Sequence, residues 1–572
     1  MFRKNDRHRQ TSFIDGLEWL PGKLRQRLRQ SWAGVFYREV LCRIDEELFA
    51  ELYSDAASRP NAPINILVGF EILKSGFGWS DEETYEQVCY NLQVRHALGL
   101  GDLRAEIFTL RTVYNFRQRV RTYAEETGIN LMQRVFEQVT DAQLAAVQIK
   151  TGWQRMDSTQ VLSNLAQWTR LELLVGVLQN VYQQLPEALQ ARWQARLEAY
   201  LHGRPHQVCH RIKASEQEAH LQALGELLSA LVADVEQETP QHPALELARR
   251  VLAEQFVADA LGSVRLRPAE NVASDSLQSP HDPDATYRVK GGQRYRGGYV
   301  VNVSETADPE NQVQLLTDVQ VEPNHTDDAQ LLKQALDDQE ERGVDVDKMT
   351  TDGGYTGPAG DAACAAHNVE LRATRMRGGK STGHCWGWEK YAWQQDAEGT
   401  PLRVTCPQGV TVTLQPGRGP ERFIARFPQT TCDTCPLVSQ CRVQMRARLG
   451  PSLYVTRRAV AVAVQRQRLR PEDASIRTVV EASVREVKHP FSGGKLPVRG
   501  LTRARMVIYG SALMVNVRRL YKHFADHFSQ SHSETPVLDA SMPFSRLYAW
   551  FTNLQRHFAP LGRGRVLVST GA

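Results

Sequence analysis

Along the first 150 residues, apolar and polar positions recur with the spacing of amphipathic α-helices. The segment Ser80-Asp81-Glu82-Glu83 predicts a helix start, with Ser80 as the N-cap and Glu83 closing a capping box. Another helix is predicted to begin in Arg111 to Val120, and it carries the basic residues Arg111, Arg117, Arg119 and Arg121. Short helices with basic faces are typical of a helical DNA-binding region, but they also fit any helical bundle.

From about 165 to 260 the pattern stays helical and becomes rich in leucine, as in Leu171-Glu172-Leu173-Leu174-Val175. Long helices are predicted through Leu221–Leu231 and Ala244–Leu261, with a proline-containing break at 239–243 between them. Core packing accounts for these leucines. We therefore expect this block to be helical, with its leucines in a core.

Near residue 299 the spacing of apolar residues changes from a helical period to the alternation of β-strands. Strands are predicted at Tyr299–Val303 and Gln314–Val321. A helix follows near Asp327–Arg342, and then comes a strand over Val344–Thr351. The order strand, helical insert, strand, strand, helix, strand predicts an α/β core interrupted by insertions.

Three acidic residues of this core are candidates for catalysis. Asp157 and Asp352 each follow a short apolar segment, which we interpret as a strand end, and Glu481 lies on a predicted helix. Two strand-end aspartates and one helix glutamate are the carboxylate set that can hold two divalent cations for phosphodiester chemistry. We also expect Gly353 and Gly354 to leave backbone room for a phosphate or a metal beside Asp352.

The predicted helix around Glu481 has a basic face. Offsets of four and seven residues bring Arg477, Arg485 and Lys488 onto the stripe that carries Glu481. The helix is expected to continue into a further basic stretch. A lone acid among bases suits a metal beside a phosphate backbone, so we expect five residues to bind DNA: Arg477, Arg485, Lys488, Lys495 and Arg499.

Charge along the chain supports a polyanionic partner. The 572-residue chain, of 64.6 kDa, is long enough for several domains and has an ordinary globular composition. Its net charge is only +4, but residues 442–505 contain 15 Lys or Arg against four acids, and residues 1–45 contain ten against five. One basic run alone would be a solvated face. Two separate basic regions, one of them around Glu481, favour nucleic acid.

The segment 376–450 contains a cluster of four cysteines that could bind a metal. Cys432 and Cys435 form a C-x-x-C pair between Cys406 and Cys441. Four thiolates can supply a closed, tetrahedral, structural zinc site. Disulfides are disfavoured in a reducing cytosol. The alternative is a set of unrelated buried cysteines.

Several protein classes are disfavoured. The longest apolar stretches, such as Ala459–Val464, are too short to span a bilayer, and the N-terminus lacks the apolar segment of a secretory signal, so we expect a cytoplasmic protein. The sequence contains no GxxxxGK[ST] loop, so ATP use is not indicated.

Three neighbouring residues, His325, Asp327 and Asp328, could be metal ligands, but we favour a helix-capping role. Ser158 has no evident base partner in the sequence.

These motifs, in their order and spacing, resemble a DDE transposase of a bacterial insertion sequence, in the branch with a Y-R-E-K signature. The likeness covers about 40–520. Its main motifs are Met156-Asp157-Ser158-Thr159, Thr351-Asp352-Gly353-Gly354-Tyr355, and the Arg477-Glu481-Lys488 helix with Arg499-Gly500-Leu501. The helices around 78–99, the region 287–303 and the four-cysteine insertion are also similar. Ala474 replaces the signature's tyrosine, which affects a phosphate or base contact and not the metal acids.

The resemblance implies an α/β fold with an RNase H-like catalytic core. The core would comprise residues 151–164, 286–375 and 451–522. It would be interrupted by a helical insertion at 165–285 and a cysteine-rich, zinc-binding insertion at 376–450. A helical DNA-binding domain, 1–150, would precede it, and a C-terminal tail, 523–572, would follow.

The resemblance also implies an activity. Water would first cut a strand at the end of the element, and the freed 3′-hydroxyl would then attack target DNA. Asp157, Asp352 and Glu481 would hold two Mg²⁺ or Mn²⁺ ions, and Cys406, Cys432, Cys435 and Cys441 a structural Zn²⁺. The partners would be double-stranded DNA, as terminal inverted repeats and target, and a second copy in a homodimer on the DNA ends.

The expected location is the nucleoid in the cytoplasm, with no membrane contact. Two alternatives remain open. One is a catalytically silent, domesticated DNA-binding protein, which would keep the basic faces and lose an acid. The other is a two-metal nuclease that cuts DNA and never joins it.

Overall fold

The computed structural model describes residues 1–6, 19–54, 60–104, 106–239, 241–242, 244–258, 263–290, 292–376, 385–396, 398–446 and 450–531. The chain divides into two compact units, Met1–Tyr521 and Lys522–Ala572, and apart from the last turns of the helix at 501–531 the features below belong to the first. This unit mixes helices and sheets and begins with a helical region, as the sequence predicts. Beyond Ser531, the expected C-terminal tail lies outside the described residues. In the part of the chain that the structure describes, none of the helices has the length and apolar character that crossing a membrane requires.

The N-terminal region is helical throughout its described part. Its α-helices are α1 (Gly22–Gln30), α2 (Trp32–Glu39), α3 (Ile64–Phe77), α4 (Asp81–Tyr90), α5 (Leu92–Ala97), α6 (Leu110–Thr127) and α7 (Leu131–Ala146). The predicted capping box at the start of α4 is confirmed, because the Ser80 and Glu83 side chains each accept the other residue's backbone N–H. Arg117 of α6 does not belong to a free basic face. Its guanidinium pairs with Glu71 of α3 at 2.7 Å and Asp81 of α4 at 2.6 Å, so it holds three helices together.

The central sheet combines antiparallel and parallel strands. Its strands are β1 (Trp153–Leu162), β4 (Thr286–Lys290), β5 (Gln293–Thr306), β6 (Leu316–Pro323), β7 (Lys348–Thr351) and β8 (Glu370–Ala373). The order is β4-β5-β1-β7-β8, and β6 also pairs with β5. Strands β1, β5 and β6 pair antiparallel, whereas β1, β7 and β8 pair parallel. The parallel strands are connected through helices, as parallel pairing requires.

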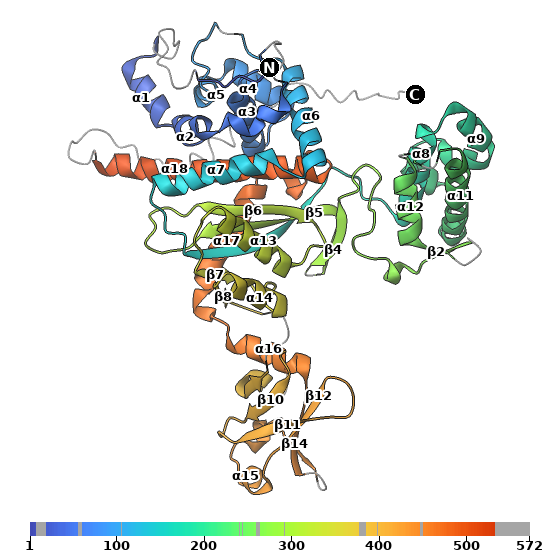
Figure 1. The fold of residues 1–572 in the computed structure, drawn as a ribbon, viewed down its shortest axis with the longest axis vertical. Coiled ribbons are helices and arrows are strands. Elements are labelled where there is room, and N and C mark those ends of the chain that lie inside the picture. Colours follow the sequence, from blue (N-terminus) through green and yellow to red (C-terminus); the bar gives the residue numbers. More distant parts are fainter. Residues whose placement is uncertain are drawn as a thin grey trace, which may run out of the picture. The chain divides into compact units, whose positions relative to one another are not determined.

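Helices cover both faces of this sheet (Figure 1). On one face, Met156 of β1 packs in a core with Leu332 and Leu336 of α13 (Asp328–Glu341) and Cys364 of α14 (Pro358–Ala366). On the other face, Arg155 donates to a backbone carbonyl of α17 (Ala474–Lys488). Successive side chains of a strand point to opposite faces. Helix α17 therefore lies on the face toward which the odd-numbered residues of β1, including Asp157, point.

Two further groups of elements interrupt this arrangement in the sequence. Between β1 and β4 come α8 (Arg170–Gln184), α9 (Glu187–Leu201), α10 (Pro205–His210), α11 (Gln217–Glu238), α12 (Ala244–Gln255) and the small pair β2 (Phe256–Ala258) and β3 (Val264–Leu266). Their leucines form a core of their own, as expected. The second group is an antiparallel sheet ordered β13-β14-β12-β11-β10-β9. Its elements are β9 (Ala392–Gln395), β10 (Pro401–Thr405), β11 (Thr411–Pro416), β12 (Arg422–Arg426), α15 (Gln429–Asp433), β13 (Gln444–Arg446), β14 (Gly450–Thr456) and α16 (Arg457–Gln467).

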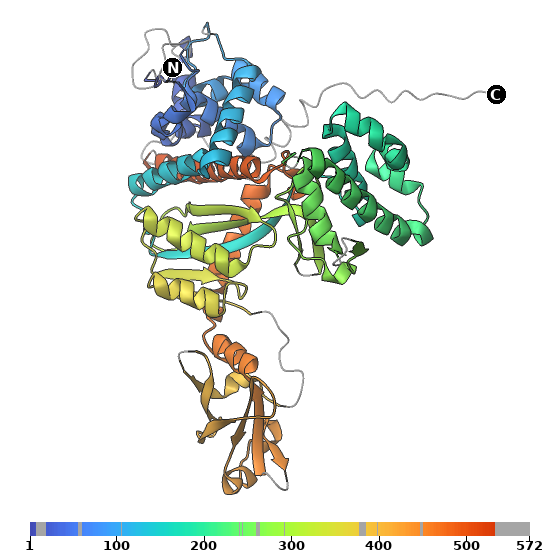
Figure 2. The same ribbon diagram turned by 45° about the vertical axis from the view of Figure 1, so that its right-hand side comes forward.

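The long helix α18 (Leu501–Ser531) packs against the N-terminal helices. Figures 1 and 2 show it side by side with α7, and the rings of Phe136 and Tyr509 lie 5.8 Å apart between these two helices. Helix α18 also packs closely against α3, where Gly76 faces Met514 of α18. A Cβ added to Gly76 would overlap the Met514 side chain. The N-terminal helices and the central sheet are thereby joined in one compact unit.

Candidate active site

Asp157 lies on β1, and Asp352 directly follows β7, the adjacent parallel strand. The last pair in the β1–β7 register is Arg155 with Thr350. Continuing this register by two residues along both segments places Asp157 beside Asp352. Strand β7 ends at Thr351, which confirms the predicted strand end before Asp352. The same prediction is wrong for Asp157, because β1 continues to Leu162 through its long pairing with β5. Asp157 is therefore held in mid-strand.

Glu481 comes close to Asp157 on α17, which packs against both β1 and β7. Val480, Val484 and Val487 of this helix are buried, at the spacing of one helical face, and this face packs toward the sheet. The Arg477 guanidinium lies between the two acids, with Nη2 2.9 Å from a Glu481 oxygen and 3.8 Å from an Asp157 oxygen. Asp157 on β1 and Glu481 on α17 thus share the positive charge of the Arg477 guanidinium.

The electrostatics of Asp157 reflect crowding and burial. The pKa of Asp157 is raised to about 6, chiefly by burial and also by the charge of Asp352, although Arg477, Lys290 and the Ser158 backbone N–H lower it. An Asp carboxyl ordinarily has a pKa near 4. A buried carboxylate beside another carboxylate favours any added positive charge.

Asp328, at the first turn of α13, completes the surroundings of Asp352. Its carboxylate accepts a hydrogen bond from the Ser158 hydroxyl at 3.0 Å, and Lys290 donates to the same hydroxyl at 2.9 Å. A Cβ added to Gly354 would lie 2.7 Å from an Asp328 oxygen and 2.9 Å from an Asp352 oxygen. The space beside this glycine, which we expected to admit a phosphate or metal, holds two carboxylates instead.

The capping expectation for this helix start is confirmed at one residue. Asp327 is the N-cap of α13, and its side chain accepts the Ala329 N–H at 3.1 Å. His325 instead contacts the Thr286 hydroxyl at 3.2 Å. Asp328 follows the cap and points toward Ser158, which the capping pattern alone did not indicate.

The five bases expected to bind DNA do not lie on one helix. Helix α17 ends at Lys488, a short turn follows at 492–494, and α18 begins at Leu501, so the predicted continuation of the helix is wrong. The Lys488 amine donates to the Thr159 hydroxyl at 2.7 Å, Lys495 to the Leu165 carbonyl at 3.1 Å and Arg499 to the Asn164 carbonyl at 2.8 Å. These three bases therefore gather along the end of β1, whereas Arg485 is exposed on α17.

The cysteines expected to bind zinc lie around one pocket. Cys406, Cys432, Cys435 and Cys441 all line it, together with apolar side chains such as Val443 and Phe427. Within the described ranges, however, no three His, Cys, Asp or Glu residues are arranged so that they could hold a metal ion. The expected zinc site is therefore not supported. In their present positions, the Asp157, Asp352 and Glu481 side chains also do not form such a metal-binding group.

Comparison with protein families covers two parts of the chain. Residues 405–521 match a family described as Transposase DDE domain, and residues 25–119 match a Transposase domain (DUF772). Together these matches indicate a DDE transposase of an insertion sequence. The match to the transposase DDE domain includes Glu481 and the basic residues around it, but neither Asp157 nor Asp352. No curated protein and no solved structure matches the chain.

The resemblance inferred from the motifs is thus confirmed at the level of the family. The transposase domain match at 25–119 falls on α1 to α6, and the DDE match runs from the cysteine-rich sheet through α17 to α18. Such families indicate DNA as the substrate.

Proposed function

We propose that this chain is a transposase that cuts DNA at the ends of an insertion sequence and transfers the cut strand to target DNA, in a metal-dependent reaction. The observation that carries the proposal is that Asp157 on β1 and Asp352, directly after the adjacent strand β7, lie under the helix that carries Glu481, because α17 packs against both strands. Three carboxylates on rigid elements of one α/β core are the donor set that in-line phosphoryl transfer needs.

An RNase H-like core fits the strand pairing. Three antiparallel strands, β6, β5 and β1, are followed across the sheet by the parallel strands β7 and β8. We assign the core to 151–164, 286–375 and 451–522, the two insertions to 165–285 and 376–450, and the helical DNA-binding domain to 1–150. The separate hydrophobic cores of the two inserted segments support these boundaries.

The donor chemistry of the site fits Mg²⁺ or Mn²⁺. Carboxylate oxygens are the ligands that such cations take in proteins. Arg477 already lies between Asp157 and Glu481, so this place favours positive charge. When bound, two divalent cations would activate the attacking hydroxyl and stabilise the leaving oxygen. Asp157, Asp352 and Glu481 would hold them once the Arg477 guanidinium turns away.

The bases around the acids would orient the DNA. Arg477, released from the acids, and Arg485 would contact phosphates along α17. Lys488, Lys495 and Arg499 lie near the end of β1 and would contact the strand beyond the scissile phosphate. The proposed partners are terminal inverted repeats and target DNA, with two copies of the chain on paired ends.

The test uses purified protein and DNA carrying the inverted repeats that flank its gene. Asp157→Asn, Asp352→Asn and Glu481→Gln should each lower cleavage by about a thousandfold or more, because metal coordination contributes several kcal/mol to the transition state. DNA binding in gel shifts should remain, since the basic residues are unchanged.

The same assay separates the alternatives. Retained cleavage by any one of these variants removes that residue from the site. A wild-type protein that binds the ends and does not cut with Mg²⁺ would be the silent DNA-binding protein. Cleavage without joined products would indicate the nuclease.

A further inference from the structure

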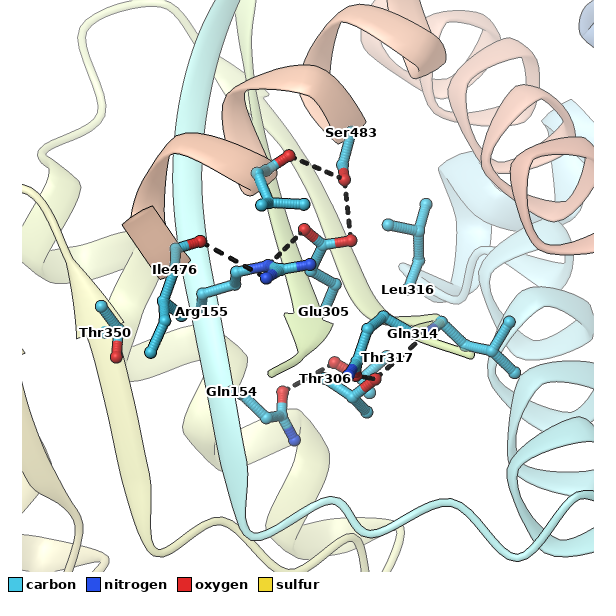
Figure 3. Close-up of polar contacts among 12 residues, drawn as sticks. Gln154, Arg155, Glu305, Thr306, Gln314, Leu316, Thr317, Thr350, Ile476 and Ser483 are labelled. Carbon is cyan, nitrogen blue, oxygen red and sulfur yellow. Dashed lines mark hydrogen bonds and ion pairs between the residues drawn. The ribbon is translucent and has the colours of Figure 1, made fainter. Parts of the chain in front are cut away.

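A buried carboxylate joins β1 to α17 close to two of the candidate acids. Glu305 of β5 is fully buried and accepts hydrogen bonds from Arg155 Nε at 2.6 Å, the Ser483 hydroxyl at 2.7 Å and Arg519 Nη1 at 2.6 Å. Figure 3 shows Arg155 and Ser483 converging on it from the strand and the helix. Arg155 stands directly opposite Glu305 in the β1–β5 register. One side chain therefore bonds both elements.

The spacing of these contacts relates them to the active site. Arg155 lies two residues before Asp157, on the same face of β1, and Ser483 lies two residues after Glu481. Two residues along an α-helix correspond to about 200° around its axis. Anchoring Ser483 to the sheet therefore fixes the rotation of α17, and with it the direction in which Glu481 points.

Ser483 is a polar residue within the apolar stripe of α17. It is fully buried among Val480, Val484 and Val487. A buried hydroxyl without a partner is costly, so its bond to the carboxylate ties the helix to one position. Sliding α17 by one residue would break this bond and also the one from Arg155 to the Ile476 carbonyl.

The network extends to α18 through Arg519. This guanidinium contacts Glu305, the Ser483 hydroxyl at 2.6 Å and Glu486 at 3.0 Å. Burial alone lowers the pKa of Arg519, but the charges of Glu305 and Glu486 outweigh burial and raise it. Removing the shared carboxylate would leave Arg519 with Glu486 and would take from Arg155 the acid with which it pairs.

We infer that Glu305 is a positioning residue, which sets the distance between Asp157 and Glu481 by holding Arg155 and Ser483 together. This inference rests on the proposed function, since it concerns the geometry in which these acids bind a divalent cation. A purely structural network would affect the stability of the fold and leave cation affinity unchanged in the folded protein. Cation affinity therefore distinguishes the two roles.

The test removes the Ser483 hydroxyl, which donates to Glu305 and accepts from Arg519, without removing a charge. Ser483→Ala should weaken Mn²⁺ binding to the DNA-free protein, measured by calorimetry, by about three- to tenfold, a part of what a hydrogen bond to a charged group contributes. The Mg²⁺ concentration for half-maximal cleavage should rise by a similar factor. DNA affinity in gel shifts should stay within about twofold, because no phosphate contact is lost.

The matched control is Thr84→Ala, which deletes another fully buried hydroxyl, one that donates to the Ser80 carbonyl at 2.6 Å in α4. It should leave Mn²⁺ binding unchanged. Glu305→Gln should weaken Mn²⁺ binding too, less than additively with Ser483→Ala. Should Glu305→Gln not fold, Ser483→Ala decides alone.

Wild-type Mn²⁺ affinity in folded Ser483→Ala, or an equal loss in Thr84→Ala, would overturn the inference. A wild-type protein that neither binds Mn²⁺ nor cuts DNA would instead refute the proposed function, and the inference with it. A loss confined to the Glu305 network supports both.

Discussion

Asp318 of β6 is a carboxylate that the fold buries almost completely. Burial raises its pKa to about 8, although the charge of Arg342, with Nη2 3.7 Å away, opposes this. Its other oxygen has no hydrogen-bond partner among the residues that the structure describes. The folded protein therefore binds a proton at Asp318 more tightly than the unfolded chain, in which the pKa is about 3.9.

This proton links stability to pH. Because the folded state keeps the proton, the contribution of Asp318 to stability is fully present below pH 4 and is lost as the pH rises toward 8. We expect Asp318→Asn, which cannot ionise, to be more stable than the wild type above pH 8, by an amount on the order of a few kcal/mol. Urea unfolding at pH 5, 7 and 8.5 measures the difference, and a difference that does not change with pH would contradict it.

Gly354 allows two carboxylates to lie side by side. An added methyl group would lie within 3 Å of oxygens of both Asp328 and Asp352 and would push them apart. We expect Gly354→Ala to fold, because this residue is exposed, and to lower metal-dependent cleavage by about tenfold or more, as displaced ligands do. Gly22→Ala is the control, since nothing lies within 4 Å of its added Cβ. Equal rates for the two variants would show that the two carboxylates need not be close.

Whole elements were more predictable from the sequence than the positions of single side chains. The capping box at Ser80 and the helix around Glu481 depend on neighbouring residues, so local pattern revealed both. The mid-strand position of Asp157 depends on the pairing of β1 with β5, about 145 residues later in the chain, which no local pattern contains. Glu305 was missed for the same reason. It is one acid in a strand, and its partners come from β1, α17 and α18.

The contact between α3 and α18 gives a prediction at the level of elements. Gly76 lets α18 approach so closely that a methyl group would overlap Met514. We expect Gly76→Ala to destabilise the protein by about 1–3 kcal/mol, the usual cost of overpacking. Met514→Ala removes Cγ, the atom nearest the added methyl group, and leaves only its Cβ in close contact. The double variant should therefore be more stable than the sum of the two single effects predicts, by about 1 kcal/mol. Urea denaturation of the wild type, the two single variants and the double variant measures this coupling. Strictly additive effects would contradict a tight contact between α3 and α18 at Gly76 and Met514.

At the level of the whole molecule, many positive charges serve the fold rather than a ligand. Arg117, Arg155 and Arg519 are largely buried and paired with acids, although each belongs to a basic or mixed segment of the sequence. Charge counts along the chain therefore overstate the surface available to DNA. The bases that remain near the acids are fewer, and Lys488 is the most informative of them.

Lys488 is half-buried, and burial together with the charge of Arg485 lowers its pKa. Its amine donates to Thr159, two residues beyond Asp157 on the same face of β1, and it has two further protons for a phosphate. If Lys488 neutralises a DNA phosphate, Lys488→Ala should lower the slope of log affinity against log salt by about one, for any DNA sequence. If the amine only secures Thr159, the slope should equal that of the wild type. Titrations of end DNA and unrelated DNA across salt, with Lys333→Ala as a control for an exposed lysine paired with Asp337 on α13, decide between the two roles.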